Sequence, residues 1–258
     1  MRKVVSRDGT TIAYEKAGEG PPIVLVNGGF RDHTIFDSLV PELAPRCTVF
    51  VYDRRGRGES GDSPAYAVER EIEDLTAVIG EAGGQAVVFA GSSGANLALE
   101  AAMAGAPITK LALHEPYFRV EGYPQPPEGF LESLKALLAR DERGEAAELF
   151  LAELVGFSPE AIAEWRGTPL WATNEANAHT LPYDTAICGD FKVPAARLAA
   201  LRLPALVVNS EGTSDWLRDA AVDTAKALPN GWGMSLPGSW HRVETDILGR
   251  VLAGFATT

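Results

Sequence analysis

The sequence predicts an α/β protein in which helices cover both faces of a largely parallel β-sheet. Short apolar runs of strand length alternate with segments of helical spacing over most of the 258 residues, as in chains that form parallel sheets. This alternation is interrupted by roughly 80 residues of mostly helical pattern, which cannot lie within the sheet. With 46% hydrophobic and 22% charged residues, the chain has an ordinary globular composition and can bury a substantial core.

The first half of the chain carries the clearest alternation. The expected elements are, in order, a hairpin over residues 3–17, a strand over 21–29, a helix over 35–44, a strand over 47–53, a helix over 66–82, a strand over 85–91, a helix over 94–104 and a strand over 110–116. The Asp8-Gly9 dipeptide supports the hairpin, because it favours a tight turn between strands. The later strands are continuous apolar runs, which are typical of strands buried on both faces.

The pattern changes after Pro116 and returns near residue 201. Residues 128–167 show only helical spacing, and residues 168–200 are mixed. A strand over 203–210, a helix over 214–228, a strand over 231–238 and a helix over 243–257 then follow. We therefore expect residues 1–118 and 201–258 to form the core, and residues 119–200 to form a mostly helical cap over one end of the sheet.

The charge balance and the cysteine count exclude several classes of protein. The 35 Asp and Glu residues outnumber the 23 Lys and Arg residues, which gives a formal net charge of −12. Nucleic acids and anionic membranes select basic surfaces, so we expect neither as a partner. Cys47 and Cys188 are too few for a disulfide framework and are expected to be free thiols. The polar start and the lack of any apolar run of ~18 residues predict a soluble, cytoplasmic protein.

The most specific motif is the sequence AVVFAGSSGANLALEAA at residues 86–102. An apolar strand leads into a turn of small residues and serines, and the turn opens a helix of small residues. A nucleophile elbow requires this context, because its sharp turn lifts the nucleophile above the strand and leaves room only for small residues two positions away. The alternative interpretation is a helix start that is merely capped by serine.

Either serine of this motif satisfies the size requirement. Centring the turn on Ser93 places Gly91 and Ala95 two positions away, and the strand then fills the chain up to the turn. Centring it on Ser92 also leaves small residues on both sides. We prefer Ser93 as the nucleophile and expect Ser92 to contact substrate.

Three motifs together resemble the α/β-hydrolase family over nearly the whole chain. Besides the elbow, LVNGGF at residues 25–30 takes the place of the family's His-Gly loop, and YDRRGRGES at residues 52–60 matches its Asp-x-Arg-Gly-x-Gly-x-Ser turn. The resemblance implies the α/β-hydrolase fold, with a mostly parallel sheet of about eight strands and a helical cap. It also implies a catalytic triad in the chain order nucleophile, acid, histidine.

In this order the histidine follows the last strand, where His241 is the one candidate. A neutral imidazole there can accept the serine proton and return it to a leaving group. His114 and His179 precede the last two strands and fit poorly. His33 follows the NGG loop, where it either contacts substrate or lies on the surface.

Two carboxylates compete as the acid of the triad. The family usually supplies the acid after the strand over 203–210, where Asp215 is a late candidate that also suits the first turn of a helix. A minority of members supply it one strand earlier, where Glu115 ends the strand over 110–116. Glu115 is preferred, because a carboxylate that follows a buried strand needs a partner, and a histidine N–H would provide one.

The resemblance also implies an oxyanion hole. Its donors are expected to be the N–H of Gly94, which follows Ser93, and the N–H of Gly29 in the NGG loop, with Phe30 next to it contacting substrate. Asn27 stands where the family usually has histidine, which bears on the geometry of this loop. Aromatic side chains in the cap form either its core or the wall of a pocket: Phe150, Phe157, Trp165, Trp171 and Tyr183.

Residues 56–61 match G-x-G-x-x-G, the pattern of a dinucleotide site. The third glycine of such a site opens a helix that faces the pyrophosphate, whereas Asp-Ser-Pro follows here. We therefore expect Arg54, Arg55 and Arg57 in this turn to be ion-paired, and we expect no nucleotide, metal or other cofactor.

Together these motifs predict a serine hydrolase that cleaves an ester or lactone through an acyl-enzyme. The alternatives are a biosynthetic enzyme that uses the same triad for elimination, cyclisation or acyl transfer, and a ligand-binding protein without activity. A serine nucleophile disfavours the dehalogenase and epoxide hydrolase relatives, which use aspartate. We expect a mostly apolar small-molecule substrate and leave a homodimer open.

Overall fold

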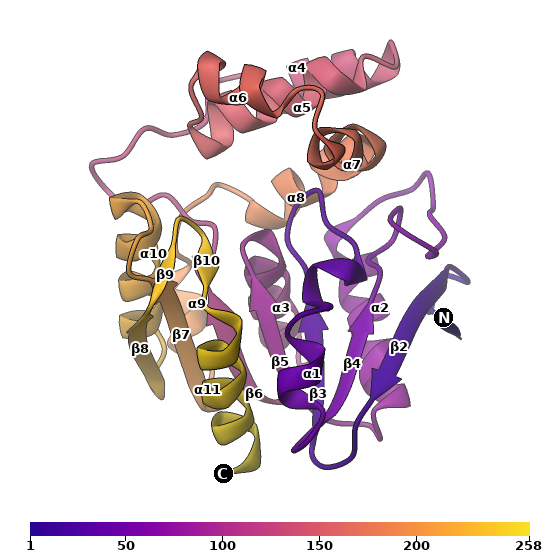
Figure 1. The fold of residues 1–258 in the computed structure, drawn as a ribbon, viewed down its shortest axis with the longest axis vertical. Coiled ribbons are helices and arrows are strands. Elements are labelled where there is room, and N and C mark those ends of the chain that lie inside the picture. Colours follow the sequence, from indigo (N-terminus) through magenta and orange to yellow (C-terminus); the bar gives the residue numbers. More distant parts are fainter.

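Eight strands form one sheet in the order β1-β2-β4-β3-β5-β6-β7-β8 in the computed structural model, which describes residues 1–258 (Figure 1). Within this sheet, β2 pairs antiparallel with β1 and β4, and every other pairing is parallel. β9 (Gly238–Ser239) and β10 (Arg242–Val243) form a separate antiparallel pair. The strands are β1 (Arg2–Val5), β2 (Thr11–Ala17), β3 (Pro22–Val26), β4 (Thr48–Tyr52), β5 (Ala86–Gly91), β6 (Ile108–His114), β7 (Ala205–Ser210) and β8 (Gly231–Leu236). This mostly parallel sheet confirms the predicted fold class.

Helices cover both faces of the sheet, because the strands are apolar on both sides (Figure 1). The helices of the core are α1 (Val40–Leu43), α2 (Val68–Glu81), α3 (Ser93–Met103), α10 (Asp215–Ala227) and α11 (Thr245–Thr257). Val24 and Val26 of β3 pack in the layer that contains α2, α3 and α10. Ile23 and Leu25 alternate with them and pack in the layer that contains α1 and α11.

The helix expected over residues 35–44 is two short pieces. A 3₁₀ turn, η1 (His33–Phe36), precedes α1, and Pro41 lies in the first turn of α1. Proline has no N–H to donate and its ring clashes with the preceding turn, so it begins a helix more easily than it continues one. One uninterrupted helix is therefore disfavoured here.

The regular elements of the cap are all helical, and most of the cap lies beyond the carboxyl ends of the parallel strands (Figure 1). Its elements are α4 (Phe130–Ala139), α5 (Arg143–Phe150), the π-helical turn η2 (Leu151–Val155), α6 (Pro159–Trp165), α7 (Pro169–Asn177), the 3₁₀ turn η3 (Ala178–Thr180), α8 (Leu181–Cys188) and α9 (Ala195–Leu198). Most of its apolar side chains form a separate cluster around Leu134 and Leu154. Ile187 of α8 and Leu198 of α9 pack instead in the core layer of α3, so the end of the cap is anchored to the sheet domain.

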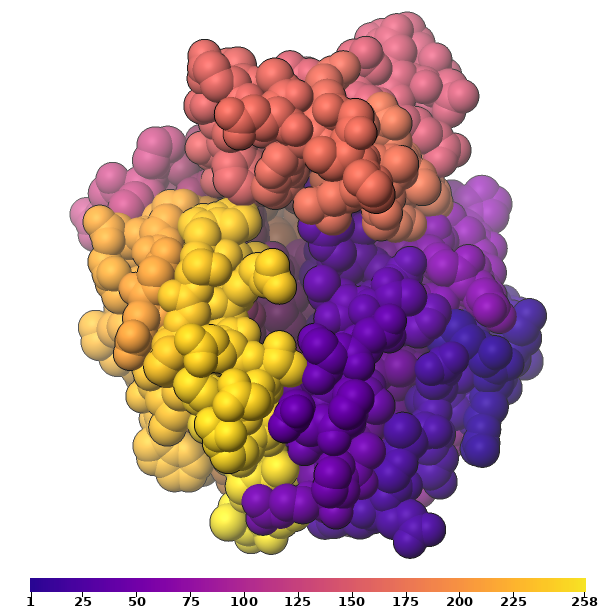
Figure 2. Space-filling model, viewed as in Figure 1, coloured from indigo at the N-terminus to yellow at the C-terminus, as the bar shows by residue number.

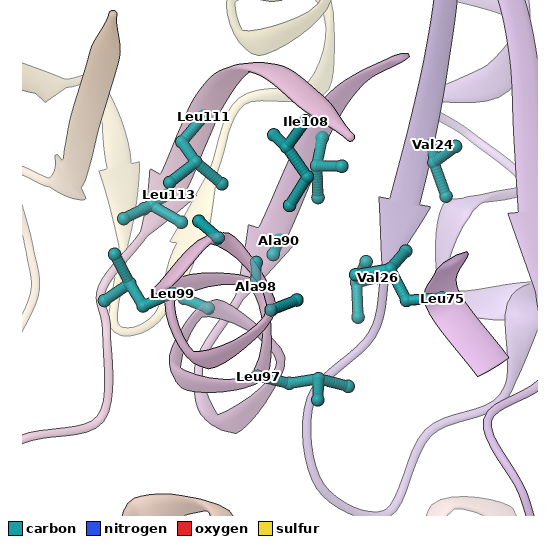
Figure 3. Close-up of a cluster of buried hydrophobic side chains, with 14 of the residues drawn as sticks. Val24, Val26, Leu75, Ala90, Leu97, Ala98, Leu99, Ile108, Leu111 and Leu113 are labelled. Atoms are coloured by element: carbon teal, nitrogen blue, oxygen red, sulfur yellow. The ribbon is translucent and has the colours of Figure 1, made fainter. Parts of the chain in front are cut away.

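Helix α3 packs closely on the centre of the sheet. Figure 3 shows Leu97, Ala98 and Leu99 lying among the side chains of β5 and β6. The small residues of α3 permit this close approach, and at position 94 the approach leaves room only for glycine. A Cβ atom on Gly94 would lie 2.4 Å from the Asn27 carbonyl oxygen, at the loop that follows β3.

Neither cysteine is exposed or bonded. Cys47 and Cys188 are buried free thiols, as the sequence predicts. No helix is both long and apolar enough to cross a membrane.

We expect Gly94→Ala to lower the free energy of unfolding by about 1–3 kcal/mol, the usual cost of forcing extra volume into a packed site. Gly80→Ala in α2 is the matched control, because a Cβ atom there meets no atom within 4 Å. It should be neutral or stabilise the protein by ~0.5–1 kcal/mol through helix propensity. Urea unfolding of both variants measures the difference, and equal effects would show that the close approach is unimportant.

Candidate active site

The turn between β5 and α3 is centred on Ser92. Its backbone has φ 56° and ψ −132°, a conformation that residues with a side chain rarely adopt. The strand ends at Gly91 and the helix begins at Ser93, so Ser92 alone joins them. Gly28 lies against it, because a Cβ on Gly28 would be 2.8 Å from the Ser92 Cβ. Strained backbone of this kind at a strand-to-helix turn is the geometry of a nucleophile elbow.

This geometry corrects the preference for Ser93. Ser93 is the first residue of α3 and is buried, and its hydroxyl donates a hydrogen bond of 2.7 Å to Asp184 Oδ1. Both serines have small residues two positions away, so the size rule could not separate them. Gly94 separates them, because no side chain fits there. The strict small position two residues after the nucleophile is therefore position 94, which makes Ser92 the centre of the turn.

Glu115 follows directly after β6 and is fully buried. Its Oε1 accepts hydrogen bonds of 2.8 Å from the N–H and the hydroxyl of Ser210, and its Oε2 is bonded to His241 Nδ1. Burial alone would raise the pKa of Glu115, but the interactions with His114 and His241 outweigh it and hold the pKa well below its usual value. Glu115 is thus an ionised carboxylate directed at His241.

Asp215, the other candidate acid, lies outside the site. It is the first residue of α10, its side chain is 73% exposed, and it pairs with Arg218. The helix-start interpretation of Asp215 is therefore the one that the structure supports, and the idea that it contacts His241 is wrong.

The hydrogen bond to Glu115 fixes the orientation of His241. A carboxylate can only accept, so Nδ1 carries the proton and Nε2 of the neutral ring is left as an acceptor. The ring stacks on His114 with centroids 5.3 Å apart and an interplanar angle of 19°. His241 and Ser92 line the same cavity. No hydrogen bond joins them in this structure, and catalytic hydrogen bonds of this type often tighten only when substrate binds.

The oxyanion-hole residues require one correction. Because the turn is centred on Ser92, the next backbone N–H belongs to Ser93, and this first helical N–H has no partner within its own helix. Gly94, the predicted donor, is packed against the Asn27 carbonyl and does not line the cavity. Gly29 and Phe30 do line it, as expected of the loop after β3.

The three arginines of the YDRRGRGES turn are ion-paired, as the sequence predicts. Arg54 Nη1 and Arg57 Nη2 lie 2.8 and 2.7 Å from the two oxygens of Asp184 in the cap helix α8. Arg54 also binds Glu71 through two hydrogen bonds, and Arg55 pairs with other carboxylates. Burial would raise the pKa of Asp184, but the two guanidinium groups outweigh burial and lower it.

The same arginines hold the loop after β3. Arg54 donates to the Asn27 carbonyl, and Arg57 donates to the Asn27 side-chain oxygen and, at 2.6 Å, to the Gly28 carbonyl. Asn27 thus braces the loop from the position where the family usually has histidine. Because Asp184 also accepts from Ser93, one buried network joins the loop after β3 and the start of α3 to the cap.

Asp184 is not among the site residues that the sequence predicts. A single acidic residue in a short helix of the cap belongs to no motif. Its partner Arg54 lies 130 residues away in the sequence, so no local pattern connects the two. The available signal was a surplus of arginines in the turn after β4, because three adjacent guanidinium groups that are buried need several carboxylates.

Of the other histidines, His114 lines the cavity beside His241, whereas His33 and His179 do not. His33 bonds Asp53 through its Nδ1 at 2.8 Å, and this contact outweighs the effect of burial and raises the pKa of His33. His179 bonds the Gly56 carbonyl. Two clusters offer metal-type ligands, His114–Glu115–His241 and Asp32–His33–Asp53. The carboxylates at their centres are already committed to hydrogen bonds with neighbouring residues, so neither cluster is an open ligand set.

A cavity of about 680 Å³ lies between the cap and the carboxyl ends of the strands. Figure 2 shows a hollow beneath the cap, between the N-terminal and C-terminal parts of the core. Its wall contains several aromatic side chains, among them three of the predicted cap residues, Phe150, Phe157 and Trp165. The other two do not reach it, because Trp171 is buried in the cap cluster and Tyr183 stacks on Tyr66.

This fold, with an elbow serine beneath a capped cavity, is that of an α/β hydrolase. Residues 23–246 match the alpha/beta hydrolase family. The match covers most of the chain, so the protein belongs to this family. Together with its similarity to solved hydrolases, this makes it an enzyme of the hydrolase type.

Solved structures and curated proteins are similar to this chain. An alpha/beta hydrolase from Sphaerobacter thermophilus is 46% identical, with 98% of this chain and 99% of that one covered and a TM-score of 0.95. A thermophilic esterase from Thermogutta terrifontis shares the fold at 23% identity, with 98% and 96% covered and a TM-score of 0.74. The probable oxidoreductase EphD of Mycobacterium tuberculosis is 41% identical over 85 residues, which are 31% of this chain and 14% of that protein. The chain therefore spans only a small part of EphD.

We expect Asp184→Asn to lower the free energy of unfolding by about 3–5 kcal/mol, because Arg57 would keep a buried charge without its carboxylate. Glu148→Gln is the control, since it breaks an exposed pair with Arg166 and should cost at most about 1 kcal/mol. Urea unfolding compares them. If the two variants lose the same stability, the buried network does not hold the cap.

The lowered pKa of Glu115 also predicts the response to acid. The unfolded chain, where the pKa is near 4.5, binds the proton before the folded protein does, so this contribution to stability is full above that pH and is lost as the pH falls toward the folded value. Unfolding measured between about pH 3 and 5 should therefore show a smaller loss in Glu115→Gln than in the unaltered protein. Asp215→Asn, which removes an exposed carboxylate, should leave the slope unchanged.

Proposed function

We propose that the protein is a serine hydrolase that cleaves a carboxylic ester or lactone through an acyl-enzyme. In this proposal Ser92 is the nucleophile, His241 is the general base and then the general acid, and Glu115 orients His241. The observation that carries it is the strained backbone of Ser92, at a strand-to-helix turn in a cavity that His241 also lines.

The proposed reaction follows from the protonation states of the site. Ser92 Oγ attacks the carbonyl carbon while His241 Nε2 takes its proton, and the ionised Glu115 stabilises the imidazolium that forms. The N–H groups of Ser93 and Gly29 are proposed to bind the carbonyl oxygen as it becomes negative. His241 then gives its proton to the leaving oxygen, and water repeats the sequence to release the acid.

The surroundings of Ser93 argue against it as the nucleophile. Its hydroxyl points at Asp184, which is held ionised by two arginines and is therefore a weak base. A hydroxyl needs a base of higher pKa within reach to become a nucleophile, and a histidine provides one. Ser93 is better suited to hold the start of α3, and with it the proposed oxyanion donor, against the cap.

The cavity supports a small-molecule substrate. Its volume of about 680 Å³ lies in the ordinary range for small-molecule sites, and 21 of its 39 lining residues are hydrophobic. Aromatic walls and a cap that excludes water favour an acyl group with an apolar body.

Labelling with a fluorophosphonate probe separates the two serines. We expect the unaltered protein and Ser93→Ala to react and Ser92→Ala not to react. Ester hydrolysis should fall by a factor on the order of 10⁴ or more in Ser92→Ala, as when a triad nucleophile is removed.

The other outcomes are equally clear. Labelling of Ser92→Ala but not of Ser93→Ala would make Ser93 the nucleophile. An unaltered protein that neither labels nor turns over any ester would refute the hydrolase proposal. Products formed in ¹⁸O-labelled water should carry the label, and its absence would indicate elimination, cyclisation or acyl transfer instead.

A further inference from the structure

We propose that Arg31 and Asn174 form a subsite for a carboxylate, so that the substrate is an ester or lactone that carries one free carboxylate at the end of its apolar body. Both residues line the cavity that contains Ser92. This inference rests on the proposed hydrolase function and names the class of substrate for it.

Unlike Arg54 and Arg57, Arg31 is partly buried in the wall of the site without a salt bridge to a carboxylate. It lies two residues after Gly29, in the loop after β3, and its one side-chain hydrogen bond is a contact of 3.0 Å from Nη1 to Asn174 Oδ1. The neighbouring Asp32 is turned to η1, where its Oδ1 accepts from the N–H and the hydroxyl of Thr34. Arg31 therefore keeps several N–H groups free.

Asn174 supplies a second unused donor. It lies on α7 and is fully buried, and its oxygen is taken by Arg31 while its Nδ2 has no partner. Buried amide groups are nearly always hydrogen-bonded, so an unmatched donor in the wall of a cavity indicates an acceptor that binds there. The contact with Arg31 fixes which end of the amide is free.

A carboxylate matches this pair of donors. It has two oxygens that only accept, whereas the guanidinium and the amide nitrogen only donate. Burial lowers the pKa of Arg31 by more than the Asp32 carboxylate raises it, so the desolvated guanidinium is only partly compensated. A bound carboxylate would supply the rest of that compensation through charge-assisted hydrogen bonds.

The other buried charges in the wall of the cavity are already balanced. Asp184 is neutralised by Arg54 and Arg57, and Glu115 behind the cavity is paired with His241. Asp32 also lines the cavity, but its Oδ1 is held by Thr34 and it makes no salt bridge with Arg31, so the guanidinium keeps its donors for a ligand even in a chain with a net charge of −12. One carboxylate is therefore favoured inside the cavity, while the acidic surface disfavours a substrate with many negative charges.

Matched pairs of esters test the subsite. The monoethyl esters of the dicarboxylic acids from succinic to suberic acid are compared with the ethyl esters of fatty acids of equal length, so that each carboxylate replaces a methyl group. For the best-fitting length we expect kcat/KM to favour the acidic ester by roughly ten- to a hundredfold, the usual strength of a hydrogen bond to a charged group. Arg31→Gln should reduce this ratio to near one.

Asn174→Asp is the second variant, because it places a carboxylate of the same shape beside Arg31 and should also abolish the preference. Arg250→Gln is the control, since it removes one positive charge from an exposed pair on α11 and should leave the ratio unchanged. Binding of adipate to Ser92→Ala protein, followed by tryptophan fluorescence, gives a readout without turnover. It should weaken by a similar factor when Arg31→Gln is added.

The outcomes separate this inference from the hydrolase proposal. Hydrolysis of neutral esters with no preference for acidic ones, or a preference that survives Arg31→Gln, would overturn the subsite and leave the hydrolase. Adipate binding that depends on Arg31 in a protein that hydrolyses no ester would support the subsite and overturn the hydrolase.

Discussion

The buried pairing of Asp184 with Arg54 and Arg57 is the interaction on which the site depends. It joins the cap helix α8, the turn after β4 and the loop after β3, and Ser93 extends it to the start of α3. Buried charges of this kind tolerate no unpaired intermediate, because separating them in a low dielectric is costly. The cap therefore cannot lift at α8 without breaking this network.

Much of the fold could be predicted from the sequence, because it depends on local patterns. The apolar runs that became β3, β5 and β7 have the length and composition of buried parallel strands, and turn residues limit each of them. The prediction of one helix over residues 35–44 was wrong for a local reason as well, because Pro41 favours the start of a new helix. Family resemblance supplied the strand number, which no local pattern contains.

The candidate site was predictable where chain order limits the choices. His241 is the one histidine after β8, the last strand of the main sheet. Glu115 directly follows the buried strand β6, where a charge needs a partner. The assignment between Ser92 and Ser93 depended on one residue of register, and register in a tight turn follows from contacts with the Asn27 carbonyl that no sequence displays. Arg31, Asn174 and Asp184 are recognisable only from what they contact, or fail to contact, in three dimensions.

The place of Glu115 at the end of β6 has a consequence for how this chain can vary. The proposed nucleophile and acid both precede the cap, and His241 is bonded to Glu115 and not to Glu211, the one charged residue in the loop after Ser210. In the proposed site, residues 211–214 therefore do not supply the acid, which most relatives take from this loop. Substitution in that loop is limited by packing instead, because Gly212 lies against the Gly238 backbone and Thr213 is buried, so shape rather than charge is the property that this loop has to keep.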